Sequence, residues 1–268
     1  PVLVDGKTLN AFSYQLVDGQ ILFGGNNIIY QYSCTEEKVK PLLLLQSDSP
    51  LTVNYFKQVD EERFLVVDKY RGVFWVDAKT GQTSRFPVVH KKKEYNSCWV
   101  DCESHLWLAP YQGGLECYSL QGHGKLLYHY TTENSLLGHN SVTDIKEFGN
   151  ELWIATDGGG INILNRQSEF FQQIKHSPYD EHSISTDFIR VLFEDSFGIK
   201  WAGTVHNGLI QIREGFMKHY SFVGGCDLKG HGYRSISCLC EDHEGNVWMG
   251  VEHSGLSKYD VQKKKIIH

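Results

Sequence analysis

A short, mostly apolar segment centred on a tryptophan, followed by a glycine seven residues later, recurs along the chain. Four copies share this pattern, each with an aliphatic residue directly after the glycine: Leu106-Trp107-Leu108 to Gly114-Leu115, Leu152-Trp153-Ile154 to Gly160-Ile161, Lys200-Trp201-Ala202 to Gly208-Leu209, and Val247-Trp248-Met249 to Gly255-Leu256. Two weaker copies precede them: Ile21-Leu22-Phe23-Gly24 with Ile28-Ile29-Tyr30, and Phe64-Leu65-Val66 with Gly72-Val73. Repeats of roughly 40–50 residues are typical of propellers and solenoids, in which each repeat is one structural unit.

Each repeat is expected to fold as strands separated by tight turns. In the last repeat the expected strands are 235–240, 246–251, 256–259 and 264–267. The turn Asp242-His243-Glu244-Gly245 supplies an aspartate that caps its own backbone and a glycine that tolerates positive φ. The fifth repeat follows the same order, with a turn at 195–198 and an outer strand at 219–222.

The tryptophan segments are apolar without alternation, as in Leu152-Trp153-Ile154-Ala155, so both faces of these strands should be buried. A propeller buries both faces because each blade packs between two neighbours, whereas a two-layer sandwich predicts alternation. No segment shows sustained helical periodicity. We therefore predict an all-β fold, a β-propeller of about six four-stranded blades, either complete or part of a seven-bladed ring.

The repeats use nearly the whole chain and leave no linker, so we expect 1–268 to be a single domain. The predicted blades are roughly 11–50, 51–92, 93–134, 135–182, 183–230 and 231–268. Residues 1–10 either add a strand to the last blade or belong to a further blade. Because the chain begins at Pro1 with neither an initiator methionine nor a signal peptide, we expect a fragment of a larger protein.

Charge argues against a nucleic-acid surface, because 26 basic residues face 32 acidic ones and give a net charge of −6. The lysine runs 91–93 and 263–265 are best explained as solvated charge at loops or sheet edges. No stretch approaches the roughly 20 apolar residues of a membrane span. The longest candidate, 42–45, has the length of a strand.

The seven cysteines are odd in number and include no C-x-x-C pair, so a disulfide framework is not expected. We expect most of them to be small buried hydrophobic residues. Two groups superficially resemble zinc sites, Cys98 with Cys102 and His105, and Cys238 with Cys240 and His243. Each has only three candidate ligands where a structural zinc site needs four, so we predict no metal and no cofactor.

Two segments resemble the two-component regulator propeller repeat, whose consensus places an acidic pair and a glycine before a tryptophan strand. They are 194–204, Glu-Asp-Ser-Phe-Gly-Ile-Lys-Trp-Ala-Gly-Thr, and 241–250, Glu-Asp-His-Glu-Gly-Asn-Val-Trp-Met-Gly. The polar-Ser-aliphatic elements Asn134-Ser135-Leu136 and His182-Ser183-Ile184 match a further element of that family. The resemblance is strong across residues 97–262 and weak before them, where the tryptophan is lost.

This resemblance implies the extracytoplasmic sensor region of a hybrid two-component histidine kinase. Such a region is periplasmic, part of an inner-membrane protein, and commonly built from two propellers and a β-sandwich. The implied ligand is an oligosaccharide, the implied partners are the adjacent propeller and β-sandwich, and the full-length protein is expected to be a homodimer. The segment itself is expected to be neither an enzyme nor a nucleic-acid binder.

Ligands of propellers usually lie on the face that carries the loops between second and third strands. Aromatic rings and fixed polar groups at these positions suit sugar recognition, although ordinary solvated turns explain them as well. The candidate ligand-binding residues are Tyr70, Arg71, Tyr111, Gln112, Asp157, His206, Asn207, Glu252 and His253.

Two other hypotheses for the function stay open. One is a propeller lactonase or lyase acting on a sugar derivative, and the other is a protein-interaction scaffold. No nucleophile elbow or zinc-protease motif is present, so no catalytic residue is predicted. The acidic residues Glu194, Asp195, Glu241 and Asp242 are better explained by turn chemistry than by catalysis. The glycines 158–160 join two expected strands and therefore read as a hairpin rather than a phosphate loop.

Overall fold

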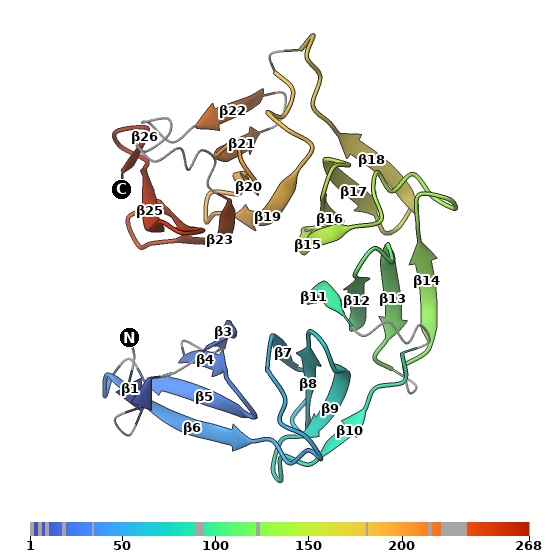
Figure 1. The fold of residues 1–268 in the computed structure, drawn as a ribbon, viewed down its shortest axis with the longest axis vertical. Coiled ribbons are helices and arrows are strands. Elements are labelled where there is room, and N and C mark those ends of the chain that lie inside the picture. The colour runs from blue at the N-terminus through green and yellow to red at the C-terminus, as the bar shows by residue number, and fades with distance from the viewer. Residues whose placement is uncertain are drawn as a thin grey trace. The chain divides into compact units, whose positions relative to one another are not determined.

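The computed structural model describes residues 3–4, 7–8, 11–17, 20–33, 35–88, 94–121, 124–180, 182–213, 216–220 and 235–267. Their regular elements are all β-strands (Figure 1). The strands are β1 (Leu3–Val4), β2 (Lys7–Thr8), β3 (Ser13–Val17), β4 (Gln20–Gly24), β5 (Ile28–Ser33), β6 (Lys38–Leu44), β7 (Tyr55–Gln58), β8 (Arg63–Asp68), β9 (Gly72–Asp77), β10 (Thr83–Arg85), β11 (Tyr95–Val100), β12 (His105–Pro110), β13 (Leu115–Ser119), β14 (Leu126–Tyr130), β15 (Val142–Phe148), β16 (Glu151–Thr156), β17 (Ile161–Asn165), β18 (Phe170–Ile174), β19 (Ile189–Glu194), β20 (Lys200–Thr204), β21 (Leu209–Arg213), β22 (Phe216–Tyr220), β23 (Ile236–Glu241), β24 (Val247–Val251), β25 (Gly255–Asp260) and β26 (Lys265–Ile267).

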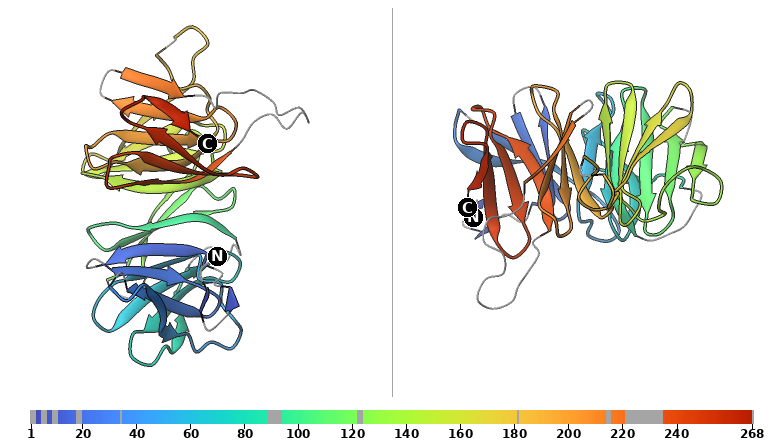
Figure 2. Two further views of the ribbon diagram at one scale, coloured as in Figure 1. Left: turned by 90° about the vertical axis from the view of Figure 1, so that its left-hand side faces the viewer. Right: turned by 90° about the horizontal axis from the view of Figure 1, so that it is seen from above.

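From β3 onward, every four consecutive strands form one sheet, and neighbours in sequence are neighbours in the sheet. The strands alternate in direction within each sheet (Figure 1, Figure 2). The described residues thus form six four-stranded antiparallel sheets, which confirms the prediction of an all-β propeller with six blades. Each sheet lies inside one of the six predicted ranges. We number the sheets as blades 1 to 6.

Contacts divide the chain into two compact units, which are described separately below. The first comprises residues 1–108 and 116–128, and so holds blades 1 and 2 and most of blade 3. The second comprises residues 109–115 and 129–268, which hold blades 4, 5 and 6. The prediction of a single domain remains a prediction.

The N-terminal strands β1 and β2 do not join any of the six four-stranded sheets, so they do not add a strand to the last blade, and membership of a further blade remains a prediction. β1 pairs with β2 through Leu3 and Thr8, so the two form a separate hairpin. Blade 6 takes its outer strand, β26, from its own repeat. The predicted outer strand of the fifth repeat begins earlier than expected, at Phe216, and its last two predicted residues, 221 and 222, lie outside the described part of the chain, as does the lysine run 91–93.

Burial on both faces of the second strands is confirmed in blades 3, 4 and 5. In β12, β16 and β20 every residue after the first is buried. The second strand of blade 6, β24, alternates instead, and Trp248 is only half-buried. Within the second unit blade 6 packs against blade 5, through contacts of β23 with β19 and β20.

The cysteines contradict the expectation that most of them are buried. Of those in the described residues, only Cys117 is buried, Cys98 is intermediate, and Cys102, Cys238 and Cys240 are exposed. Cys102 lies in a turn, and the other two exposed thiols occupy alternate positions on β23 of blade 6. Cys34 and Cys226 lie outside the described residues.

An aspartate in the first turn of the blade holds both the turn and the tryptophan. In blade 5, Asp195 Oδ1 accepts the backbone N–H groups of Phe197 and Ile199 at 3.0 and 2.9 Å. Its Oδ2 accepts the indole N–H of Trp201 at 2.8 Å. Both side chains are buried, so each satisfies a polar group of the other that would otherwise be costly to bury.

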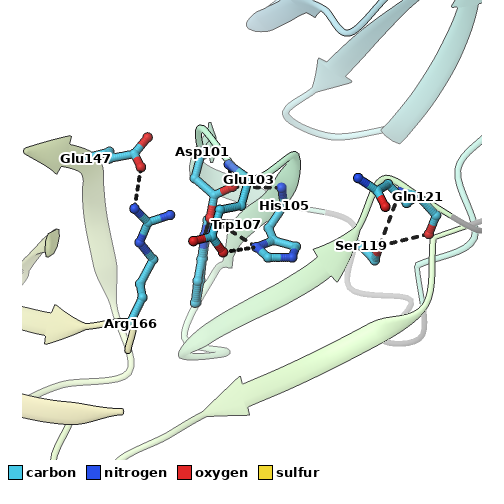
Figure 3. Close-up of polar contacts among 8 residues, drawn as sticks. All are labelled: Asp101, Glu103, His105, Trp107, Ser119, Gln121, Glu147 and Arg166. Carbon is cyan, nitrogen blue, oxygen red and sulfur yellow. Dashed lines mark hydrogen bonds and ion pairs between the residues drawn. The ribbon is translucent and has the colours of Figure 1, made fainter. Parts of the chain in front are cut away.

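The same arrangement recurs in blades 3 and 6. Asp101 Oδ2 accepts the indole N–H of Trp107 at 2.9 Å and also lies 3.3 Å from His105 Nδ1 (Figure 3). Asp242 Oδ2 accepts the indole N–H of Trp248 at 2.8 Å. Desolvation opposes ionisation of Asp242. The hydrogen bonds that its carboxylate accepts, first among them the one from the Trp248 indole, outweigh desolvation and hold the pKa of that carboxyl well below its usual range. Turn chemistry therefore accounts for Asp195 and Asp242, as predicted. The hydrogen bond from each aspartate to the tryptophan indole was not predicted from the sequence.

Blade 4 lacks this aspartate, and the indole N–H of its tryptophan has a different acceptor. Trp153 Nε1 donates to Glu151 Oε2 at 2.9 Å, from a residue on the same strand. An ion pair between Glu147 and Arg166, 2.6 Å between Oε1 and Nη2, lies in the same sheet (Figure 3). The indole hydrogen bond is therefore kept even where the turn sequence differs.

The repeated glycine is required by backbone conformation, and in blades 3 and 4 also by space. Gly160 and Gly255 have φ of 70° and 79°, the region in which L-residues are strained. A Cβ on Gly160 would lie 2.3 Å from the carbonyl oxygen of Ile174, whereas a Cβ on Gly255 would meet nothing within 4 Å.

These two glycines give a matched stability test. We expect Gly160→Ala to lower the free energy of unfolding by about 3–5 kcal/mol, because steric overlap adds to backbone strain. Gly255→Ala should cost only about 1–2 kcal/mol, since strain acts alone. Urea denaturation of both variants measures the difference, and equal losses would contradict the packing described for Gly160.

Candidate functional site

All nine predicted ligand-binding residues lie in the turns that join the second and third strands of blades 2 to 6. Tyr70 and Arg71 lie between β8 and β9 in the first unit. The remaining seven lie in the equivalent turns of the second unit, before β13, β17, β21 and β25: Tyr111, Gln112, Asp157, His206, Asn207, Glu252 and His253.

The blade 2 turn borders a sizeable cavity. This cavity has a volume of about 1000 Å³ and lies in the first unit. Its lining comes from the connection between blades 1 and 2, the β8–β9 turn, β10 with the residues after it, and the start of β11: Ser47, Asp48, Ser49, Leu51, Tyr70, Arg71, Gly72, Val73, Phe74, Thr83, Ser84, Arg85, Phe86, Pro87, Val88 and Tyr95. We call it the blade 2 cavity.

Asp68, which is 2% exposed, holds the turn that carries Tyr70 and Arg71. Its Oδ1 accepts the backbone N–H groups of both residues at 2.9 Å. Its Oδ2 accepts the backbone N–H of Thr52 at 2.8 Å, from the connection between blades 1 and 2. One carboxylate therefore fixes two walls of the cavity relative to each other.

Asn27, in the β4–β5 turn, holds the other end of the same connection. Its Oδ1 accepts the hydroxyl of Ser47 at 3.1 Å and the backbone N–H of Leu51 at 3.3 Å. Its Nδ2 donates to the carbonyl of Leu45 at 2.6 Å. Asn27 itself has φ of 59°, a conformation that asparagine tolerates better than most residues.

The β10 side of the cavity is held to the connection between blades 1 and 2 through backbone hydrogen bonds. Gln46 N–H donates to the carbonyl of Gly81 at 2.7 Å, and Thr83 N–H donates to the carbonyl of Gln46 at 3.1 Å. Tyr95 N–H donates to the carbonyl of Lys69 at 2.9 Å, which brings the first strand of blade 3 beside the turn. The cavity therefore has a preformed frame, as small-molecule sites usually have.

Aromatic and polar groups share the lining. Phe86 and Tyr95 are each 3% exposed, whereas Tyr70 is 63% exposed. The hydroxyl of Tyr95 makes no hydrogen bond to the described residues. Burial, followed by the charge of Glu116, raises the pKa of Tyr95 to about 12, so this hydroxyl keeps its proton at neutral pH.

In the second unit the predicted residues remain at separate turns. Asn207 Nδ2 donates to the carbonyl of Ser185 at 2.9 Å, and Glu252 Oε1 lies 3.6 Å from Arg190 Nη2. Asp157 forms an isolated backbone bridge with Phe188. Their roles as ligand-binding residues remain predictions.

A smaller cavity in the second unit was not predicted as a site. It measures about 250 Å³ and lies beside Trp201, Tyr220 and Tyr259 of blades 5 and 6. The hydroxyl of Tyr259 donates to that of Tyr220 at 2.8 Å. Burial and this contact raise the pKa of Tyr259 well above its usual range.

Within the described ranges, no three His, Cys, Asp or Glu side chains are placed to hold a metal ion. Nor does this part of the chain contain a helix that would cross a membrane.

Residues 231–253 match the model of the two component regulator propeller family. The match includes the segment 241–250 on which the sequence resemblance rests, and it confirms the resemblance. No curated protein matches the chain.

Two similar solved structures are extracellular domains from B. thetaiotaomicron. The extracellular domain assigned to hybrid two component system BT4673 has a TM-score of 0.75 and 18% identity, over 100% of this chain and 34% of that chain. The corresponding domain assigned to BT3049 has a TM-score of 0.69 and 19% identity, over 96% and 34%. The chain therefore spans about a third of the length of these domains.

A third similar structure is an enzyme. A catalytically inactive virginiamycin B lyase from Staphylococcus aureus, with Quinupristin, has a TM-score of 0.70 and 10% identity, over 98% of this chain and 85% of that chain. At these identities all three likenesses establish the fold alone, which is the β-propeller.

Replacing the carboxylate that links two cavity walls tests this construction. In Asp68→Asn one carboxylate oxygen becomes an amide donor, which cannot accept from Thr52 while the other oxygen serves Tyr70 and Arg71. We expect at least tenfold faster hydrogen exchange at one or more of these three amides, since about 1.4 kcal/mol of lost hydrogen bonding has that effect. Hydrogen–deuterium exchange resolved by mass spectrometry or NMR measures it.

Asp77→Asn is the matched control. Asp77 caps its own turn through Oδ1, which accepts the N–H groups of Lys79 and Thr80 at 3.0 and 2.7 Å. It makes no contact with Thr52, Tyr70 or Arg71 in the described structure. Unchanged exchange at these three amides in Asp68→Asn would contradict the role given to Asp68.

Proposed function

We propose that the chain is a non-enzymatic sensory propeller that binds an oligosaccharide as part of a hybrid two-component sensor. The blade 2 cavity is the observation that carries the proposal. It combines an exposed ring, buried rings and a frame of backbone groups, which suits a ligand with flat apolar faces and many hydroxyls. The fold shared with extracellular domains of hybrid two component systems supports the same function.

The proposal also covers the location, the partners and the signalling of the chain. The chain lies outside the cytoplasm, in the periplasm, as part of an inner-membrane protein. Its partners are a second propeller and a β-sandwich of the same chain, within a homodimer, and the signal reaches a cytoplasmic histidine kinase. Rearrangement between rigid domains carries the signal, because packed blades behave as discrete units rather than as continuously deformable ones.

The structural likeness to a lyase favours one rival function, an enzyme that acts on the bound ligand. The two functions differ in the fate of the ligand, because a sensor releases it unchanged. A protein-interaction scaffold differs from both, since it needs no small-molecule site.

The test is a binding screen of the intact 268-residue chain against an array of neutral and acidic oligosaccharides of three to six sugars. We expect at least one class to bind. Tyr70→Ala should weaken that binding at least tenfold, because an exposed aromatic platform is lost. Isothermal titration calorimetry of the array hits measures the change.

Tyr179→Ala is the matched control, because Tyr179 is 97% exposed and distant in sequence from the blade 2 cavity. Mass spectrometry of the ligand after incubation separates the sensor from the enzyme. Binding to no oligosaccharide, or conversion of the bound one to product, would overturn the proposal.

A further inference from the structure

Two arginines line the blade 2 cavity, one from the β8–β9 turn and one from β10. Arg71 ends the β8–β9 turn, and Arg85 ends β10, where it pairs with Phe74 of β9 (Figure 1). Arg85 Nη1 donates to the backbone carbonyl of Arg71 at 3.2 Å, and its guanidinium carbon lies 5.3 Å from the ring centre of Phe74.

Neither arginine forms an ion pair in the described structure. Other arginines do: Arg63 pairs with Asp60 at 2.7 Å and Arg166 with Glu147 at 2.6 Å. Among the described residues that line the cavity, Asp48 carries the single carboxylate, so two guanidinium groups face one acid there. This local excess of positive charge occurs in a chain whose net charge is −6.

We infer that the oligosaccharide proposed above is acidic and carries a carboxylate or sulfate group, which Arg71 and Arg85 bind. The inference rests on the proposed function and narrows its ligand class. A guanidinium group presents paired donors that match the oxygens of such an anion, and two together supply more donors than one anionic group needs. The exposed ring of Tyr70 stacks on the sugar, and Ser47 and Ser49 hydrogen-bond its hydroxyls.

The experiment compares saccharides that differ only in charge. The probes are trigalacturonate with its fully methyl-esterified form, and a carrageenan-derived sulfated tetrasaccharide with its desulfated form. We expect at least one acidic probe to bind at least tenfold more tightly than its neutral form. That preference should shrink as salt rises, because screening weakens exposed charge pairs.

Arginine variants locate the effect. Arg71→Gln and Arg85→Gln should each weaken binding of the acidic probe at least tenfold and weaken binding of the neutral form by a clearly smaller factor. Arg213→Gln is the control, because this exposed arginine ends β21 of blade 5 and does not line the blade 2 cavity. Inorganic sulfate and phosphate are titrated separately, to distinguish an acidic sugar from a free anion.

The outcomes separate the two proposals. Equal affinity for the acidic and neutral forms, lost in Tyr70→Ala, overturns the acidic ligand and leaves the oligosaccharide sensor standing. Inorganic sulfate or phosphate that binds as tightly as the saccharide also overturns this inference. If no saccharide of either kind binds, the proposed function fails together with it.

Discussion

One interaction recurs at several places where the fold holds two segments together: an aspartate whose two oxygens serve different elements. In Asp195 one oxygen shapes the turn and the other accepts the indole N–H of Trp201. In Asp68 one oxygen shapes the Tyr70–Arg71 turn and the other accepts the N–H of Thr52. Asp144 accepts Ile145 N–H through one oxygen and Leu192 N–H of the next blade through the other. Because buried polar groups must find partners, each such carboxylate ties local structure to packing.

This constraint explains why a binding site can lie on turns. Loops usually move, but the turn that carries Tyr70 and Arg71 is anchored at its start by a buried carboxylate. The connection opposite is anchored by Asn27 and by the backbone of Thr83 and Gly81. A ligand entering the blade 2 cavity therefore meets a surface that is already ordered, and less binding energy is lost to ordering the protein.

The repeat of tryptophan and glycine was enough to predict six four-stranded blades, because strand burial and turn conformation leave periodic traces in sequence. Tyr70 and Arg71 were identifiable by their turn position. Asp68 and Asn27 were not, since their partners Thr52 and Leu51 are distant in sequence and become neighbours only in the fold. The cysteines were misjudged because composition does not reveal that Cys238 and Cys240 lie on an exposed side of β23.

The most direct test of the bridging aspartate is a double-mutant cycle of Asp195→Asn and Trp201→Phe, followed by urea denaturation. Asp195 is 7% exposed and Trp201 1% exposed, so loss of either partner leaves a buried polar group unpaired. If the Asp195–Trp201 hydrogen bond helps to hold the blade, the two substitutions should show a coupling free energy of about 1–2 kcal/mol. Additive effects, with coupling indistinguishable from zero, would show that the indole contact does not help to hold the blade. That result would contradict the stabilising role given to the bridging aspartate.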